Sequence, residues 1–473
     1  MDATSSTSDS ADVVVLGAGP AGLAAAWRAA RRGFSVTVFE RADFVGGVAG
    51  SHEVAGLRVD YGIHRLNHNI SPRVLSDLQE LLGDDLQSKH RKDRIRVGDT
   101  WLPLPMGPRA VLRRLPTRTT ASLARDALTR PLRRVSAESY EAHVRPTVGQ
   151  TAYDSVYAPY AEKLWGLPGN ELSAAQAGRL LPGQGAWKAA GRALRPRRDR
   201  GRGRQSNRFH YPRRGFGQIS ERLAEAATKA GVEIRLSDEV YRLRPSFDDV
   251  RVSTSTGGQV DAGIVLSSLP LPLVGSLTSP GPSLQAMEDA ARLRFRAMVI
   301  VYLVHRKARW SPYDVHYLTD PNTPVIRISE PSNFRRSADD PKRRTVICLE
   351  IPCLVDDDIW NAEDDALAEL AREAIGMSGL PEVSGGGVTV ARLPRAYPIY
   401  DLRYQERLRE IEEWVQGVPQ LVTFGRLGVS SHDTSQQAML EAYEAVDAIG
   451  QDGRFDRTRW RAARAEFAEA FEY

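Results

Sequence analysis

A predicted α/β fold, built on a parallel sheet, follows from the pattern of the first forty residues and from the length of the chain. Residues 13–16 form a continuous apolar run, as expected of a strand that is buried on both faces. An alanine-rich helix is expected over residues 20–32, and a second strand over residues 35–39. This order predicts a Rossmann-like domain. At 473 residues the chain is too long for one compact core, so a second domain is expected.

The first strand and the helix are joined by three glycines at G-x-G-x-x-G spacing: Gly17, Gly19 and Gly22. This spacing allows a tight turn, close approach of the backbone to a pyrophosphate and close contact between helix and strand. The pyrophosphate would lie at the helix N-terminus, beside Pro20 and Ala21, where free N–H groups favour anions. Glu40, after the second strand, would accept hydrogen bonds from a ribose. We therefore expect a dinucleotide site, with a glycine turn that binds nothing as the alternative.

The composition is that of an ordinary globular protein, with 42% hydrophobic and 26% charged residues. No apolar run approaches the ~18 residues of a membrane helix. Residues 1–11 lack an apolar core and are expected to be a disordered leader rather than a signal peptide. Cys348 and Cys353, the two cysteines, are expected on opposite faces of one strand, so that we predict neither a disulfide nor a metal site. A cytoplasmic protein is the plain expectation.

Arginine gathers in two stretches of this chain, whose net charge is +5. Residues 109–134 hold eight arginines and residues 192–204 hold seven, the latter with Pro and Gly typical of a loop. These arginines could bind an anionic substrate or an acidic membrane surface. The favoured interpretation is a basic surface that is solvated and binds no partner. Nucleic acid is not expected, because no aromatic residues alternate with the charge.

A glycine doublet after the second strand carries a resemblance to a known family. Residues 41–48 read RADFVGGV, and this stretch resembles the second fingerprint of flavoproteins related to amine oxidases and protoporphyrinogen oxidases. The resemblance implies non-covalently bound FAD, with four residues beside it: Arg41, Gly46, Gly47 and Val48. Many relatives carry Arg where this chain has Val48. A Gly-Gly hairpin without ligand contact is the alternative.

Residues 60–64, DYGIH, resemble a loop that UDP-galactopyranose mutases and protoporphyrinogen-oxidase-like flavoproteins share. The resemblance implies that Gly62 and His64 lie beside the flavin ring. A histidine there can move a proton, since its pKa lies near neutrality. A structural histidine bonded to backbone is the alternative for His64, and the two roles are equally open for His68.

Residues 157–182 resemble the Tyr-x-x-Lys-x-Trp element of the mutase family, with these matching positions: Tyr160, Lys163, Trp165, Pro168, Leu172 and Arg179. The resemblance implies that Trp165 faces the substrate and that Arg179 contacts a diphosphate. Core packing is the equal alternative for Trp165. Arg327, in an Arg-x-x-Glu element, would lie near the substrate phosphates, or else form an exposed cross-strand pair. Tyr397 falls on a Tyr-Pro next to the substrate.

The end of the chain is expected to close the flavin site. By resemblance, the helix that follows Gly425 points its N-terminus at the flavin pyrimidine. Arg426 and the N–H groups at Asp433 and Thr434 would then stabilise negative charge on reduced flavin. Val240 would offer backbone groups to the adenine side.

The remaining segments follow the same family order. We expect helices over residues 71–83, 218–229, 362–376 and 457–473, a hairpin over 93–103, a largely helical stretch to about 183, and strands over 232–236, 260–270, 293–304 and 345–352. Three acids at 356–358 are read as charge near a helix N-terminus. The resemblance implies a Rossmann-like FAD-binding domain from residues 12–90, 205–285 and 415–450. It implies an inserted α+β substrate-binding domain from 91–204 and 286–414, with residues 451–473 as a C-terminal helix.

Three functions are open. The first is an FAD-dependent oxidoreductase that acts on a small molecule, which could contain a sugar. The substrate would transfer a hydride to flavin N5, and His64 or His432 would accept or donate the proton. The second is a redox-neutral mutase in which Arg179 and Arg327 hold the diphosphate of a nucleotide sugar. Against it, residues 182–184 replace a second family arginine and His432 replaces a family tyrosine. The third is a flavin-bound binding protein with an acidic partner. The oligomeric state is open, a dimer included.

Overall fold

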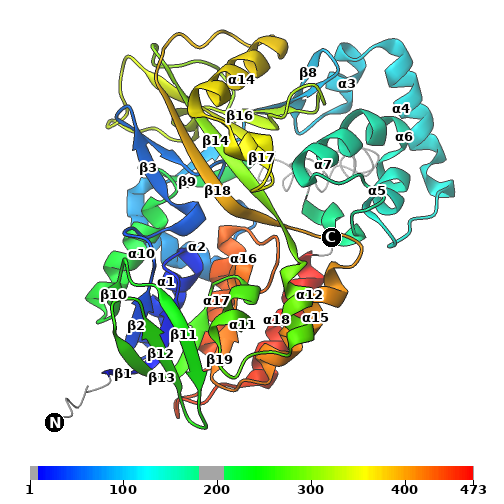
Figure 1. Cartoon of the computed structure of the whole chain (residues 1–473). Helices are drawn as coiled ribbons and strands as arrows, with labels where there is room; N and C mark the ends of the chain where they lie inside the picture. Colours follow the sequence, from blue (N-terminus) through cyan, green and yellow to red (C-terminus); the bar gives the residue numbers. More distant parts are fainter. Residues whose placement is uncertain (1–8, 180–206, 472–473) are drawn as a thin grey trace, which may run out of the picture.

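Two seven-stranded sheets dominate the computed structural model, which describes residues 9–179 and 207–471 (Figure 1). The first sheet lies in the lower part of the view and the second in the upper part, with a group of helices beside the second. The α/β fold that the sequence predicts is confirmed. No helix within the described ranges is long and apolar enough to cross a membrane.

The first sheet has the order β10-β2-β1-β13-β12-β11, with β19 also paired to β13. Its strands are β1 (Asp9–Leu16), β2 (Val36–Phe39), β10 (Glu233–Arg235), β11 (Val240–Pro245), β12 (Val250–Thr254), β13 (Gln259–Ser267) and β19 (Leu421–Thr423). β1 pairs in parallel with β2 and β13, and its apolar residues 13–16 are buried, as predicted for a central strand. Three distant parts of the chain therefore build one sheet.

Helices cover this sheet and the end of the chain returns to it. They are α1 (Pro20–Arg31), α2 (Pro72–Leu82), α10 (Gln218–Lys229), α11 (Leu271–Leu277), α12 (Leu284–Ala291), α15 (Tyr404–Gln416), α16 (Gly425–Gly428), α17 (Ser435–Asp447) and α18 (Arg457–Phe471). The helices predicted over 71–83 and 218–229 are confirmed within a residue or two. α15 was not expected, although it is amphipathic with Leu408, Ile411 and Val415 buried.

The second sheet has the order β18-β14-β17-β16-β15-β7-β8. Its strands are β7 (Asp93–Val97), β8 (Thr100–Leu104), β14 (Arg294–His305), β15 (Val315–Leu318), β16 (Arg327–Ser329), β17 (Thr345–Cys353) and β18 (Val388–Ile399). α13 (Asp358–Asn361) and α14 (Asp364–Met377) follow β17. Cys348 and Cys353 are both free thiols and belong to different core clusters on the two faces of β17, as the odd spacing predicts.

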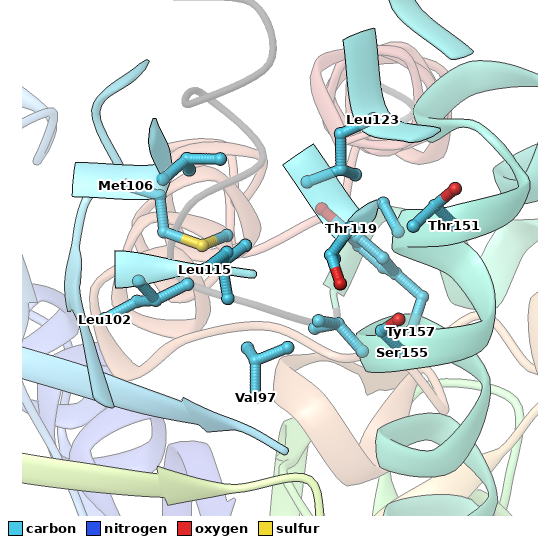
Figure 2. A pocket seen from close by; sticks show the side chains of 12 residues that line it. Val97, Leu102, Met106, Leu115, Thr119, Leu123, Thr151, Ser155 and Tyr157 are labelled. Atoms are coloured by element: carbon cyan, nitrogen blue, oxygen red, sulfur yellow. The ribbon is translucent and has the colours of Figure 1, made fainter. Parts of the chain in front are cut away.

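The predicted helical stretch after β8 is confirmed as far as residue 179, where the first described range ends. It holds α3 (Pro108–Arg114), α4 (Thr117–Thr129), η3 (Arg130–Leu132), α5 (Tyr140–Val148), α6 (Gln150–Ala152), η4 (Tyr153–Tyr157), α7 (Ala158–Trp165) and η5 (Ala174–Arg179). Between these helices and β8 lies an apolar cavity of about 30 Å³, lined among others by Met106, Leu115 and Leu123 (Figure 2). A cavity of this size has room for about one or two water molecules.

Short elements join the two sheets. They are the hairpin of β3 (Ser51–Val54) and β4 (Leu57–Asp60), the sheet of β5 (Leu66–Asn67), β9 (Arg208–Pro212) and β6 (Leu86–His90), and three single turns, η1 (Gly47–Ala49), η2 (Gly83–Asp85) and η7 (Pro331–Phe334).

One sequence prediction is corrected by the structure, and another is made more specific. Residues 9–11, assigned to a disordered leader, begin β1 and pair with Val260, Asp261 and Ala262, because the sheet continues beyond the apolar run; residues 1–8 lie outside the described ranges. The acids at 356–358 lie at a helix N-terminus, as predicted, but the helix is the separate turn α13 rather than α14. The Asp357 side chain accepts hydrogen bonds from the N–H groups of Leu354 and Trp360 and caps α13.

Candidate functional site: a glycine cradle beside a buried charged cluster

The glycine loop after β1 leaves an open space above the N-terminus of α1. A Cβ atom on Gly22 would lie 1.9 Å from the carbonyl oxygen of Gly17, so only glycine allows this contact between helix and strand. A Cβ on Gly19 would meet no protein atom within 4 Å. No side chain caps α1, and its first turn holds no acid. The N–H groups of this turn are therefore available to a pyrophosphate.

Glu40 lies at the end of β2, as predicted, and it also orders the glycine loop. Its carboxylate accepts hydrogen bonds from the N–H of Ala18 at 2.9 Å and of Ala42 at 3.0 Å. Each carboxylate oxygen has two lone pairs, so capacity remains for ribose hydroxyls. The Glu40 carbonyl accepts from Asp238 N at 3.0 Å, which brings the chain before the buried Val240 next to this acid. The roles of Glu40 and Val240 toward the cofactor stay predictions.

The glycine doublet joins the same cradle. Gly46 N donates to the carbonyl of Ala18 at 2.8 Å, and a Cβ on Gly47 would lie 3.8 Å from Gly19 Cα. Gly46 and Gly47 have φ angles of 118° and 52°, which favour glycine. The doublet is therefore not an isolated hairpin turn. Arg41 and Val48, the neighbouring predicted contacts, are exposed.

Two helix N-termini converge on this space. A Cβ on Gly425 would lie 3.3 Å from Ala21 Cβ, in the first turn of α1, and 3.9 Å from Ala438 Cβ, in the first turn of α17. Thr434 caps α17 in a capping box with Gln437. At the other end of both helices, Arg28 binds the Asp447 carboxylate at 2.9 Å. The helices therefore run in the same direction, with their positive ends together.

Arg426 is held by carbonyl groups rather than by an acid. Its Nε donates to Asp433 O at 2.8 Å, one terminal nitrogen donates to Ala396 O at 3.3 Å, and the guanidinium lies 5.2 Å from the Tyr397 ring centre. Among the described residues no carboxylate lies within ion-pair distance of Arg426. Nearby, the Glu441 carboxyl accepts a hydrogen bond from Gly425 N at 2.8 Å. Burial and the neighbouring Asp433 raise the pKa of Glu441 well above its usual value. The raised pKa favours the neutral form of Glu441 at this point.

The loop with the predicted histidine is fixed to the backbone. His64 Nε2 lies 3.1 Å from the carbonyl of Tyr61, and the ring stacks on Phe216 at 5.2 Å. Because a carbonyl only accepts, Nε2 carries the proton and Nδ1 keeps a free lone pair. Burial lowers the pKa of His64, so the ring is neutral near pH 7. His68 is exposed.

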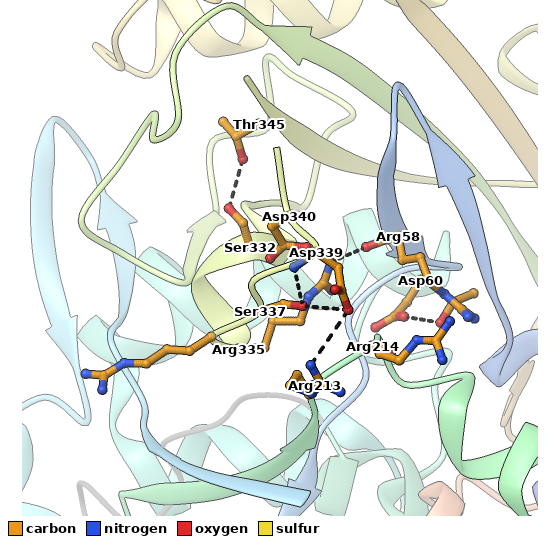
Figure 3. A network of polar contacts seen from close by, with 12 residues as sticks. Arg58, Asp60, Arg213, Arg214, Ser332, Arg335, Ser337, Asp339, Asp340 and Thr345 are labelled. Carbon is orange, nitrogen blue, oxygen red and sulfur yellow. Dashed lines mark hydrogen bonds and ion pairs between the residues drawn. The ribbon is translucent and has the colours of Figure 1, made fainter. Parts of the chain in front are cut away.

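Asp60 at the start of this loop is a structural anchor (Figure 3). Its Oδ1 accepts from Ser51 Oγ at 2.6 Å and from Phe216 N at 2.9 Å, and Tyr302 donates to its carbonyl at 2.7 Å. The buried Arg335 lies in the same network and donates to Arg58 O and to the Asp340 carboxylate. These bonds tie β4 to residues 332–345 and position Gly62.

Glu350, which sequence reasoning missed, lies at the centre of the site. This carboxylate on β17 is 1% exposed. It accepts from the N–H of Ile63 at 2.9 Å and from Arg327 Nε at 2.7 Å, and a Cβ on Gly62 would lie 3.3 Å from its carboxyl carbon. Burial opposes the charge of Arg327, but the Glu350 carboxylate outweighs this effect and raises the pKa of Arg327. An acid inside the otherwise apolar run TVICLEIP was the available signal.

The alternative of an exposed cross-strand pair for Arg327 is corrected in one respect: the pair is cross-strand, but it is buried. Arg327 is largely buried and pairs across the sheet with Glu350, because β16 and β17 place these residues opposite each other. Glu330 accepts instead from the N–H groups of Trp310 and Ser311 at 3.0 and 2.8 Å. Whether Arg327 lies near substrate phosphates stays a prediction.

An aromatic cluster adjoins this pair. Tyr397 accepts from Arg327 at 3.0 Å. Its ring packs edge-on against Trp165 at 5.8 Å, and Trp165 packs against His432 at 5.0 Å. Trp165 is 2% exposed, and its indole N–H has no hydrogen-bond partner within the described ranges. Trp165 is thus both packed and adjacent to the other predicted substrate residues. The side chain of Arg179 and the arginine run 192–204 lie outside the described residues, so their roles stay predictions.

The open space above Gly19 lies between the positive ends of α1 and α17, and such a place suits a pyrophosphate. The class that this fold and glycine loop define is the dinucleotide-binding α/β proteins. Sequence comparison is more specific. The chain belongs to the flavin containing amine oxidoreductase family, whose model matches residues 20–382. FAD is its cofactor, and the predicted family resemblance is confirmed.

Solved structures share the fold over nearly the whole chain. Reduced UDP-galactopyranose mutase has a TM-score of 0.77 and 18% identity, covering 95% of this chain and 98% of that one. A putative protoporphyrinogen oxidase from Exiguobacterium sp. 255-15 has 0.71 and 18%, covering 94% and 99%. Putrescine oxidase bound to putrescine has 0.61 and 16%, covering 93% and 99%. A 1-hydroxycarotenoid 3,4-desaturase from Flavobacterium sp. (strain P99-3) is 37% identical over 71 residues, 15% of this chain and only 14% of the desaturase.

Proposed function

We propose that this chain is an FAD-dependent oxidoreductase that removes a hydride from a small molecule. The observation that carries the proposal is the Arg327–Glu350 pair: the arginine beside Trp165 and Tyr397 is already neutralised by a buried carboxylate. A site with a balanced charge and aromatic walls suits a substrate of low charge. The family supports the oxidoreductase class.

The residues of the chain divide the work of such a reaction. FAD, when bound, supplies the two-electron acceptor at its N5 atom. The free lone pair of His64 Nδ1 can take the proton that leaves the substrate as the hydride departs, and a neutral imidazole is suited to this at pH 7. Trp165, Tyr397 and His432 would orient the substrate and exclude water. Arg426 would stabilise negative charge on the cofactor.

A redox-neutral sugar-nucleotide mutase is the second candidate. It is supported by the structural likeness to reduced UDP-galactopyranose mutase. That reaction requires cations for a diphosphate, whereas Arg327 already has a carboxylate partner at 2.7 Å. The oxidoreductase therefore remains the first choice.

The deciding experiment mixes the FAD-loaded protein anaerobically with three kinds of compound, suggested by the relatives: a diamine, a hydroxycarotenoid and a nucleotide sugar. Loss of the oxidised flavin absorbance on adding either of the first two compounds supports an oxidoreductase. Bleaching by the uncharged hydroxycarotenoid, and not by the doubly charged diamine, supports a substrate of low charge. Turnover of the nucleotide sugar only after dithionite reduction, with no bleaching by any compound, would replace it with the mutase.

A further inference from the structure

Four large apolar side chains between α3 and the loop after η3 are more than half exposed. Leu112 is 65% exposed, Leu128 81%, Leu132 84% and Val135 54%. A single exposed leucine is ordinary, but several within one short stretch indicate a surface that meets another apolar phase. We call residues 109–135 the basic apolar face.

The same stretch carries a strong positive charge. It holds eight arginines and a single acid, Asp126. Asp126 is buried, and its carboxylate binds Arg133 at 3.2 Å and the N–H of Thr151 at 2.7 Å, so its charge is used internally. The other seven arginines form no ion pair with any described residue. These seven are Arg109, Arg113, Arg114, Arg118, Arg125, Arg130 and Arg134.

The packing of α4 decides which side faces outward. Thr119 and Leu123 point into the apolar cavity beneath the helix, where Met106 and Leu115 lie (Figure 2). Arg118, Arg125 and Leu128, spaced by seven and three residues, share the opposite side and are exposed. α3 and α4 lie at the outer edge of the helical group, away from the first sheet (Figure 1).

From this arrangement we propose that the basic apolar face binds the surface of an anionic lipid bilayer. Arginines attract anionic headgroups, and leucines between them can enter the boundary of the acyl chains. Nucleic acid would satisfy the arginines but leave the leucines in water. Such binding is peripheral, and it goes beyond the proposed oxidoreductase activity, on which it does not depend.

The test is cosedimentation of the full FAD-loaded chain with vesicles of phosphatidylcholine, alone or mixed with phosphatidylglycerol. We expect binding only to the mixed vesicles, and release when the salt concentration rises from about 0.1 M to about 1 M, where charge attraction is screened. The double variant Arg118→Gln/Arg125→Gln should bind more weakly, by roughly fivefold for each arginine. Leu128→Ser/Leu132→Ser should also weaken binding.

Matched controls are Arg372→Gln/Lys307→Gln and Leu284→Ser, which change exposed residues elsewhere and should bind like the parent. Flavin absorbance and thermal unfolding show whether each variant is folded. Absence of binding to the mixed vesicles overturns the proposal. So does equal binding by the parent and both double variants, or binding to single-stranded DNA with none to vesicles.

Discussion

The Glu350 carboxylate accepts a hydrogen bond from the N–H of Ile63 at 2.9 Å, across 287 positions of sequence. This bond joins the second sheet to the loop that carries Gly62 and His64. The same carboxylate binds Arg327, which binds Tyr397. One acid therefore sets the position of residues 62–64 relative to the aromatic cluster.

Replacing Glu350 with Gln should destabilise the fold. The amide can still accept from Ile63, but Arg327 would remain buried without its counter-charge, since the two side chains are 15% and 2% exposed. Breaking such a pair costs about 3–5 kcal/mol. Urea unfolding measures the change in the free energy of unfolding. The double variant Arg327→Gln/Glu350→Gln removes both charges and should recover part of the loss; a single variant as stable as the parent would show that the pair contributes nothing.

His64 should make stability depend on pH. Because burial lowers its pKa in the folded state, the unfolded chain binds the proton first as pH falls below about 6.5. The contribution of His64 to stability is thus full above pH 7 and is lost on acidification, at up to about 1.4 kcal/mol per pH unit. His64→Gln should flatten the fall in unfolding free energy between pH 7 and pH 5. His68→Gln, an exposed change, is the control, and equal slopes for the two variants would contradict the expectation.

Substitutions at Gly19 and Gly22 should separate an effect on cofactor binding from an effect on folding. Gly19 has an ordinary φ of −74° and open space beside it, so Gly19→Val should leave the apoprotein stable while its side chain enters the pyrophosphate space. Gly22→Ala should destabilise the apoprotein itself, because the new Cβ meets Gly17 O. Flavin content after purification and the melting temperature without FAD report the two effects. Full FAD occupancy in Gly19→Val would contradict the assignment of this loop.

Local patterns predicted the cradle because its parts are local. The strand, the three glycines, α1 and Glu40 lie within one βαβ segment, where spacing alone sets geometry. The hydrogen bond between Gly46 and Ala18 follows from the same short range. The doublet could therefore be assigned to the cofactor side from residues 41–48 and the family resemblance.

The charged cluster could not be predicted in the same way. A neighbouring acid, Glu330, competed with Glu350 as the partner of Arg327, and only the register of β16 against β17 decides between them. Sheet register depends on packing over the whole domain rather than on three adjacent residues. The contact between Arg426 and Tyr397 likewise joins segments that the sequence keeps apart.

Arg426 provides the test of charge at the flavin. The family resemblance predicts that it lies where negative charge develops when FAD is reduced. Its bonds go to the carbonyls of Asp433 and Ala396 rather than to an acid. Such positive potential stabilises the reduced cofactor more than the oxidised one and raises the reduction potential. One lost charge-assisted contact is worth roughly 1.5–3 kcal/mol, so Arg426→Ala should lower the two-electron potential by roughly 30–65 mV.

The potential is measured by equilibration with a reference dye, in the parent and in Arg426→Ala with equal FAD content. Arg426→Lys is the matched variant: it keeps the charge but loses the guanidinium fork that reaches both carbonyls, so its potential should fall less than that of the alanine variant. Arg403→Ala, an exposed arginine paired with Glu406, is the surface control. An Arg426→Ala potential equal to that of the parent, with FAD fully bound, would remove Arg426 from the flavin site.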